Sequence, residues 1–179
     1  QPRSRGLGDV YKRQMWYAIL GAVLLAGDQI LKYWVVTHLA VGESAPFLPG
    51  FMQLTRLHNY GAAWSSFSGR TVLLVVFTAV LLAAVALLLI KKVVRHWTGI
   101  TACTLILSGG IGNIIDRIVH GYGVDMFDLQ LFSYPVFNLA DCCVVAGAIL
   151  GGIYYLFLYE KYDKKKKESD HAHDPSDPS

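Results

Sequence analysis

The sequence predicts an all-α membrane protein with four transmembrane helices and a small extracytoplasmic β element. Two observations support this fold class. First, 54% of the 179 residues are hydrophobic and only 16% are charged, whereas about 25% of a typical soluble domain is charged. Second, four apolar stretches approach the roughly 20 residues that cross a hydrocarbon core, at 15–36, 72–90, 98–115 and 136–158. So few charges argue against a soluble enzyme and against a nucleic-acid binder.

The flanking segments differ from the apolar stretches in composition. Residues 1–14 are polar and lack an apolar pattern, so we interpret them as a non-native or disordered extension, with Met15 as a natural start. Residues 15–160 then form the transmembrane domain. The tail at 161–179 is rich in Lys, Asp, Ser and Pro, a composition typical of disorder.

The distribution of Lys and Arg predicts the orientation, because cytoplasmic loops carry an excess of these residues. Basic residues gather at 91–95, between the second and third stretches, and at 161–167, after the fourth. We therefore expect both termini to be cytoplasmic and the loops at 37–71 and 118–135 to face outward.

The first outward loop contains a short strand pattern. Residues 51–57 alternate weakly between apolar and polar side chains and follow Pro46, Pro49 and Gly50. We expect a small extracytoplasmic sheet resting on the membrane. In the fourth stretch, Gly147 and Gly151 form a G-x-x-x-G pattern, which is typical of close helix packing.

Charged residues inside the apolar stretches are costly and therefore functional candidates. Asp28 and Lys32 are four residues apart in the first stretch, so they share a helix face and can form an ion pair. The third stretch ends with Asn113, Asp116 and Arg117 after several glycines. Packing explains the glycines, whereas the three polar side chains fit an interfacial salt bridge or a binding site equally well.

Three further aspartates come with the next segments. Asp125 and Asp128 follow the third stretch, and we expect Asp128 to lie in a solvated loop. Asn138 and Asp141 lie three residues apart after Pro135. We expect Asp141 to be about six residues into the fourth helix, about 9 Å along its axis, where an unpaired carboxylate requires a cation, a donor or a proton.

These carboxylates fit one kind of chemistry. No H-E-x-x-H or G-x-S-x-G motif is present in the sequence, so we expect no metal ion, no cofactor and no serine nucleophile. Two facing carboxylates can share one proton and activate water for peptide hydrolysis. The residues alone do not choose the pair; the candidates are Asp116, Asp125, Asp128 and Asp141.

Five motifs together resemble the lipoprotein signal peptidases (signal peptidase II), which are aspartyl peptidases of the bacterial inner membrane. In chain order the motifs are Asp28-Gln29-x-x-Lys32, Asn59-x-Gly61-Ala62-Ala63-Trp64, Gly109-Gly110-x-Gly112-Asn113-x-x-Asp116-Arg117, Val124-Asp125-Met126-Phe127 and Phe137-Asn138-x-Ala140-Asp141. The resemblance covers residues 15–158, and Met126 replaces the commoner phenylalanine of the family.

The resemblance implies an activity and its partners. The family removes the signal peptide from diacylglyceryl-modified prolipoproteins, cutting just before the lipidated cysteine. The chain would be a multi-pass protein of the bacterial cytoplasmic (inner) membrane, with its active site toward the outer leaflet. Its partners would be prolipoprotein substrates and membrane lipid, with no nucleic acid, and we expect a monomer.

The resemblance also implies roles for individual residues. The catalytic pair maps onto Asp125 and Asp141, and Asp116 would orient Arg117. The ion pair of Asp28 and Lys32 would support the fold. The substrate-binding residues would be Asn59, Gly61, Asn113, Asp116, Arg117 and Asn138.

Two other classes of protein remain open from the residues alone. Buried Asp, Lys and Arg also line transport paths, which fits a small proton-coupled carrier. A non-catalytic assembly subunit held by glycine packing is the third interpretation.

Overall fold

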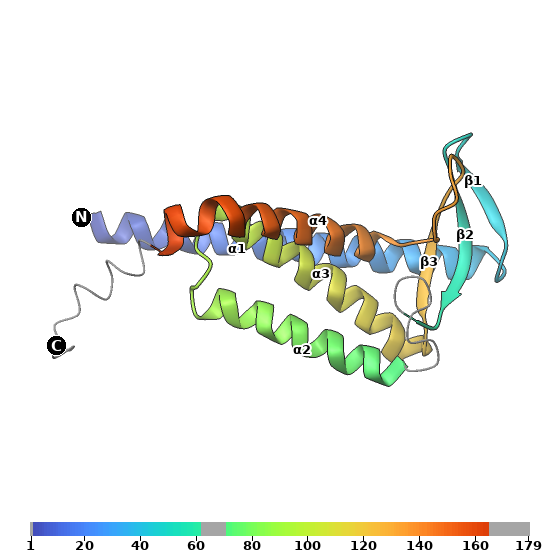
Figure 1. Ribbon diagram of the computed structural model, residues 1–179, viewed down its shortest axis with the longest axis horizontal. Coiled ribbons are helices and arrows are strands. Elements are labelled where there is room, and N and C mark those ends of the chain that lie inside the picture. The colour runs from blue at the N-terminus through green and yellow to red at the C-terminus, as the bar shows by residue number, and fades with distance from the viewer. Residues whose placement is uncertain (1, 62–70, 165–179) are drawn as a thin grey trace.

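The computed structural model describes residues 2–61 and 71–164, and it has long helices with a small sheet at one end (Figure 1). Within these residues, four helices are long and apolar enough to cross a membrane. This confirms the predicted fold class. In chain order the elements are α1 (Pro2–His38), β1 (Ser44–Leu48), β2 (Met52–Asn59), α2 (Thr71–Ile90), α3 (Trp97–His120), β3 (Gly123–Leu129), α4 (Leu139–Ile153) and the π-helix η2 (Tyr154–Lys164).

Helix α3 is the centre of the bundle. It packs against α1, α2 and α4, and half of its most apolar window is buried, compared with 6% for α2. The outer helices expose large apolar side chains such as Val23, Val72 and Ile149. A soluble protein would bury such faces, so this arrangement fits a hydrocarbon surrounding.

Glycines allow α3 and α4 to approach closely. A Cβ added at Gly147 would meet Ile106 and the backbone oxygen of Ala102 at 2.9 Å. A Cβ added at Gly109 would meet the backbone oxygen of Ala140. The packing role expected for the G-x-x-x-G pattern of α4 is therefore confirmed at Gly147.

The ends of the outer helices differ from the expected boundaries. Helix α1 begins at Pro2 instead of Met15, because adding residues to an existing helix is far easier than nucleating one. The origin of residues 1–14 stays a prediction. At the other end, η2 continues to Lys164, so residues 161–164 are helical. The rest of the predicted disordered tail, 165–179, lies outside the described residues.

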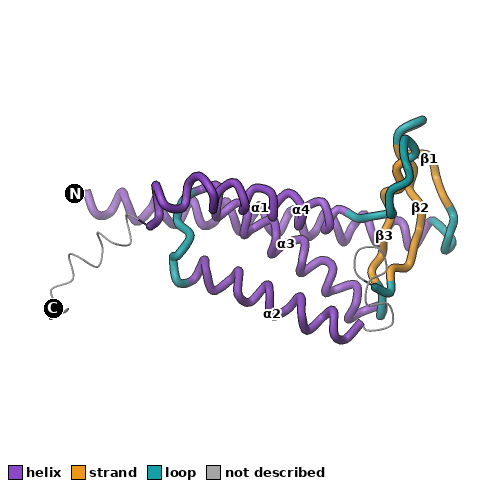
Figure 2. The backbone as a smooth tube through the Cα atoms, in the orientation of Figure 1, coloured by secondary structure: helices purple, strands orange, loops and turns teal. Residues whose placement is uncertain are grey.

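The three strands form one antiparallel sheet in the order β1-β2-β3 (Figure 2). The strand predicted at 51–57 is confirmed as β2, but the sequence analysis missed β1 and β3. The expectation that Asp128 lies in a solvated loop is wrong. Asp128 belongs to β3 and accepts hydrogen bonds across the sheet from Gln53 at 2.7 Å and from Thr55 at 3.1 Å.

A backbone bridge joins β3 to the start of α4. Phe137 pairs with Phe127, whose backbone N–H donates to the Phe137 carbonyl at 2.7 Å. Residue 137 is therefore extended, and α4 begins only at Leu139, three residues later than expected. This bridge places the first turn of α4 directly beside the strand that carries Asp125.

Candidate active site

The predicted pair of Asp28 and Lys32 is present and fully buried. Their charged atoms lie 2.8 Å apart, and the Lys32 ammonium also lies 2.6 Å from Asp116 of α3. The second Asp28 oxygen accepts the backbone N–H of Ala140 at 2.9 Å. One cation thus ties α1 to α3, and the Asp28 carboxylate ties α1 to the N-terminus of α4, where helix geometry favours an anion.

Asp116 does not orient Arg117 as the resemblance implied. Adjacent helical residues point about 100° apart, since 3.6 residues make one turn. Asp116 instead binds Lys32 and accepts from the backbone N–H of Val124 at 3.4 Å. Arg117 donates at 2.9 Å to the carbonyl oxygens of Asn113 and Gly61. Arg117 therefore connects α3 to the segment that follows β2.

Asp125 lies on β3 and accepts hydrogen bonds from two side-chain amide groups. It is 2% exposed, and its two oxygens accept from Asn59 at 2.9 Å and from Asn138 at 2.8 Å. The next residue, Met126, is fully buried in a cluster with Val35, Leu39 and Leu54. Apolar packing on one side of β3 and two amide donors on the other therefore determine where the carboxylate points.

Asp141 lies in the first turn of α4, not about six residues into the helix. The later start of α4 makes Asn138 the N-cap, and the two residues form a capping box. The Asn138 side chain accepts from the Asp141 N–H at 2.9 Å, and the Asp141 carboxylate accepts from the Asn138 N–H at 3.2 Å. Its other oxygen accepts from Asn113 at 2.8 Å.

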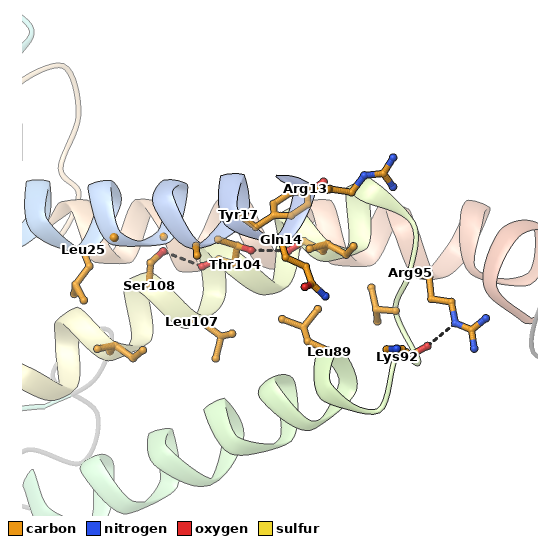
Figure 3. A pocket seen from close by; sticks show the side chains of 16 residues that line it. Arg13, Gln14, Tyr17, Leu25, Leu89, Lys92, Arg95, Thr104, Leu107 and Ser108 are labelled. Atoms are coloured by element: carbon orange, nitrogen blue, oxygen red, sulfur yellow. Dashed lines mark hydrogen bonds between the residues drawn. The ribbon is translucent and has the colours of Figure 1, made fainter. Parts of the chain in front are cut away.

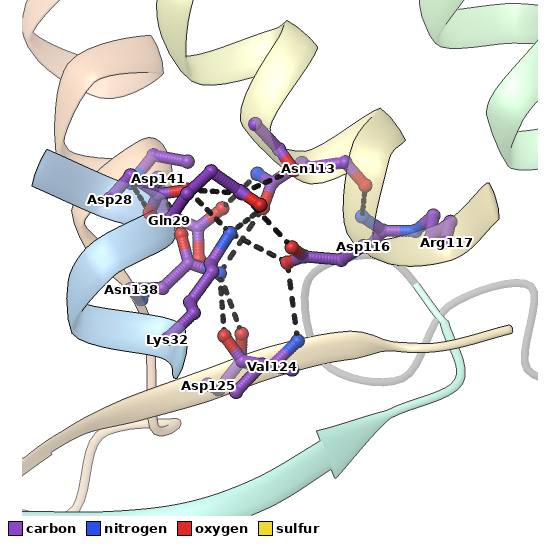
Figure 4. Close-up of polar contacts among 12 residues, drawn as sticks. Asp28, Gln29, Lys32, Asn113, Asp116, Arg117, Val124, Asp125, Asn138 and Asp141 are labelled. Atoms are coloured by element: carbon purple, nitrogen blue, oxygen red, sulfur yellow. Dashed lines mark hydrogen bonds and ion pairs between the residues drawn. The ribbon is translucent and has the colours of Figure 1, made fainter. Parts of the chain in front are cut away.

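Both aspartates therefore hydrogen-bond to Asn138, Asp125 to its side-chain amide and Asp141 to its backbone N–H and its side-chain oxygen (Figure 4). Asn138 contacts Asp125 and Asp141, and its Nδ2 atom also lies 3.2 Å from the Oδ1 atom of Asn113. Burial and, to a smaller extent, the negative charge of Asp141 raise the pKa of Asp125 to about 6. Electrostatics thus favour a proton on Asp125 at pH values below about 6.

Sequence reasoning missed Gln29, although the residue lies inside a quoted motif. Its Nε2 atom contacts Asp28 at 3.1 Å, Asp116 at 3.2 Å and the Gly112 carbonyl at 3.3 Å. A polar residue next to Asp28 in an apolar stretch was the available signal. The motif positions 62–64 lie outside the described residues.

The fold and this cluster define a class of protein. Membrane-spanning helices form a bundle with a sheet at one end. Next to this sheet lie two carboxylates that accept hydrogen bonds from asparagine side chains, and a buried ion pair lies beside them. This is the composition of an aspartic hydrolase site built into a membrane protein.

Comparisons with known proteins identify the family. A model of the signal peptidase II family matches residues 20–157. The lipoprotein signal peptidase of Enterococcus faecalis is 39% identical over 151 residues, covering 84% of this chain and 93% of that protein. The lipoprotein signal peptidase of Lactococcus lactis subsp. lactis is 37% identical over 83% of this chain and 95% of its own length. The chain therefore belongs to the signal peptidase II family and is an aspartic endopeptidase, which confirms the resemblance.

A solved structure agrees with this assignment. A bacterial membrane enzyme determined by the in meso method at 2.3 Å resolution superposes with a TM-score of 0.72 at 27% sequence identity. The match covers 91% of this chain and 94% of that enzyme. The fold is therefore that of a multi-pass bacterial membrane enzyme.

Proposed function

We propose that this chain removes signal peptides from diacylglyceryl-modified prolipoproteins and cuts just before the lipidated cysteine, with Asp125 and Asp141 as the catalytic pair. The family membership supports the prolipoprotein substrate. The observation that carries the catalytic assignment is the convergence of both carboxylates on Asn138: the Asp125 carboxylate on β3 accepts from its side-chain amide, and the Asp141 carboxylate at the start of α4 accepts from its backbone N–H.

The reaction uses the one proton that the pair shares. The ionised carboxylate takes a proton from water, whose oxygen attacks the scissile carbonyl carbon. The protonated carboxyl donates to the carbonyl oxygen, which gives a tetrahedral gem-diol. A proton then passes to the amide nitrogen, the C–N bond breaks, and the carboxyl and amine products leave. The raised pKa of Asp125 supports this residue as the initial proton carrier.

The remaining polar residues position this pair and the substrate backbone. We propose that Asn59, Asn113 and Asn138 orient the carboxylates and that Arg117 holds Gly61 beside the substrate. Asp116 is engaged by Lys32, so a supporting role suits it better than direct substrate contact.

We propose that both termini are cytoplasmic and that the active site faces the outer leaflet. The site lies beside the sheet, at the opposite end of the helices from the basic loop 91–96 (Figure 1). Positive charge on the cytoplasmic side then puts the sheet outside. The monomeric state and the contact with membrane lipid are part of this proposal.

Replacement of each carboxylate tests the catalytic assignment. Asp125→Asn and Asp141→Asn should each lower cleavage of a lipidated prolipoprotein by about 10²–10⁴-fold, the usual contribution of general acid–base catalysis. Asp128→Asn is the matched control, because Asp128 lies on the same strand but hydrogen-bonds to β2. Near-normal cleavage by either catalytic variant would reject the pair.

A chelator separates this mechanism from metal-assisted hydrolysis. We expect unchanged cleavage in the presence of a strong chelator, because both proposed proton-transfer groups are side chains of the protein. Loss of cleavage that zinc restores would contradict the proposal.

A proton-coupled carrier is the second candidate, because buried ionisable groups such as Lys32 and Asp116 also occur along transport paths. The clustering of these groups beside the strand that carries Asp125 favours the peptidase (Figure 4). Cleavage of lipidated precursor without solute flux in proteoliposomes is the expected result, and flux without cleavage would favour the carrier.

A further inference from the structure

An exposed apolar patch occupies one end of the sheet. The strand register places the β1–β2 turn beside the end of β3, because Met52 pairs with Leu48 on one side and with Leu129 on the other. The Gln130 N–H donates to the Phe51 carbonyl at 2.9 Å and joins the two chain segments there. We name the exposed large hydrophobic side chains of these segments the sheet tip: Phe47, Leu48, Phe51, Leu131, Phe132 and Tyr134.

The sheet tip lies in two segments without charge. Residues 44–55 and 129–140 contain no Asp, Glu, Lys or Arg, although 16% of the whole chain is charged. The pairing of β2 with β1 and β3 brings these two segments together at one place on the surface. An exposed apolar patch of this kind marks a contact with a membrane or with another protein.

Contacts between aromatic rings connect the tip to the interior. Phe132 and Tyr134 meet edge to face with their ring centroids 6.2 Å apart, and Tyr134 meets Phe137 in the same way at 5.8 Å. Phe137 lies 5.6 Å from Phe127, which packs against the buried cluster that includes Met126. The tip is therefore joined to the core of the sheet, so a contact that holds the tip also holds β3.

The sheet tip projects sideways from the helices. The helices lie along the long axis of the molecule, and the sheet crosses their end, so that the β1–β2 turn and the end of β3 extend past α4 (Figure 1). The chain then returns from the tip to the start of α4 at Leu139. Helix α4 exposes Val145 and Ile149 to the hydrocarbon that surrounds the bundle. The tip therefore overhangs the lipid beside α4.

A large cavity elsewhere in the protein does not account for this patch. The cavity has a volume of about 930 Å³, lies between α1 and α3, and reaches Leu25 and Ile111 (Figure 3). Ile111 precedes Gly112, whose carbonyl accepts from Gln29 in the site described above. None of the described sheet residues lines the cavity, so a molecule bound there would leave the sheet tip uncovered.

We propose that the sheet tip inserts into the membrane leaflet next to the sheet, with the acyl chains of the lipid as its partner. Aromatic side chains are enriched where a membrane meets water, and an apolar surface binds lipid in proportion to the area that it buries. A second copy of the chain and the acyl chains of a substrate are the competing occupants. The position of the tip favours lipid, because the lipid around α4 lies directly beside it.

Spin-label accessibility in phosphatidylcholine liposomes tests the proposal, in a chain whose own three cysteines are replaced. Phe47→Cys and Leu131→Cys place single nitroxide labels on the two segments of the tip. Val41→Cys is the matched control, because Val41 is 58% exposed and lies at the other end of β1. Collisions with oxygen and with a water-soluble nickel chelate should place the tip labels about 5–10 Å into the boundary between headgroups and acyl chains. The control label should collide mainly with the nickel chelate.

A charge at the tip provides a second measurement. Phe132→Asp should shift the Phe47 label toward water, because a carboxylate in lipid is costly, whereas Val41→Asp should leave that label in place. Each side chain is exposed, so the melting temperature in detergent should stay near that of the parent chain. The experiment contains no substrate, so its result does not depend on the proposed cleavage activity.

Three outcomes would overturn the lipid contact. Water-like accessibility of both tip labels would show that the tip stays outside the membrane. Shielding that disappears when the protein is diluted in lipid would assign the tip to a second copy of the chain. Shielding that appears only after lipidated precursor is added would assign it to the substrate.

Discussion

Asn138 carries three functions with one amide group. Its Oδ1 atom caps α4 by accepting from Asp141, and its Nδ2 atom donates to Asp125 and lies 3.2 Å from the Oδ1 atom of Asn113. It is 1% exposed, so any group left without a partner there is costly. Helix capping and the geometry of the site are therefore coupled in one residue.

Substitution of Asn138 can separate these functions. Asn138→Ser keeps a helix-capping oxygen but is too short to reach Asp125. Its melting temperature should fall, because Asp125 loses a buried hydrogen-bond donor. Its kcat/KM should fall at least about tenfold, because a hydrogen bond to a charged group contributes about 1.5–3 kcal/mol. Asn138→Ala should in addition lose about 1 kcal/mol of stability through the missing cap. Equal kcat/KM for Asn138→Ser and the wild type would contradict the positioning role.

Asp125 predicts a pH dependence of stability. Its folded pKa of about 6 lies above the ordinary value of 3.8, so the folded protein binds the proton more tightly than the unfolded chain. The associated stability is present below pH 4 and is lost as pH rises through 6, by about 3 kcal/mol at 1.36 kcal/mol per pKa unit.

Thermal unfolding in detergent between pH 4 and pH 7.5 measures this effect. The wild type should lose stability across this range, and Asp125→Asn should have a flatter profile because it cannot ionise. Asp128→Asn should follow the wild type. Parallel profiles for the wild type and Asp125→Asn would show that the buried carboxyl does not retain its proton.

The contact between α3 and α4 determines the position of the site at the level of elements. Asn113 lies on α3 and Asp141 on α4, and glycines keep these helices close enough for the 2.8 Å hydrogen bond between them. The backbone bridge at Phe137 holds the start of α4 against β3. Separation of the two helices should therefore disturb the carboxylate pair without changing any polar residue.

A pair of glycine substitutions tests this relation. Gly109→Ala places a Cβ against the backbone oxygen of Ala140, which cannot move without moving α4. We expect a loss of about 1–3 kcal/mol of stability and reduced cleavage. Gly152→Ala is the control, because a Cβ there meets nothing within 4 Å, and it should stabilise α4 by up to about 1 kcal/mol. Similar melting temperatures for the two variants would contradict close packing at Gly109.

At the scale of the whole molecule, the sheet and the basic loop lie at opposite ends of the helices (Figure 1). A single-cysteine experiment in a chain without Cys103, Cys142 and Cys143 tests the proposed orientation. A membrane-impermeant maleimide should label Val41→Cys in intact spheroplasts and Lys91→Cys only after lysis. The reverse pattern would place the active site on the cytoplasmic side.

Much of the fold could be predicted because hydropathy and charge are local properties of the chain. The second apolar stretch was expected at 72–90 and is observed as α2 over Thr71–Ile90. Strand β3 was missed because its backbone partners are far away in sequence, with Asp125 opposite Leu57. The local signal was also weak, because apolar and polar residues do not alternate regularly over Gly123–Leu129.

The sequence by itself determined that this protein is a four-helix membrane protein and which charged residues lie inside its apolar stretches, since both follow from the composition of short segments. Only the tertiary structure decided which of these residues meet. It joined Lys32 to Asp116 instead of leaving Asp116 with Arg117, and brought Asp125 and Asp141 to the same asparagine. The physical reason is that these contacts depend on strand register, helix packing and the start of α4, which distant parts of the chain impose together.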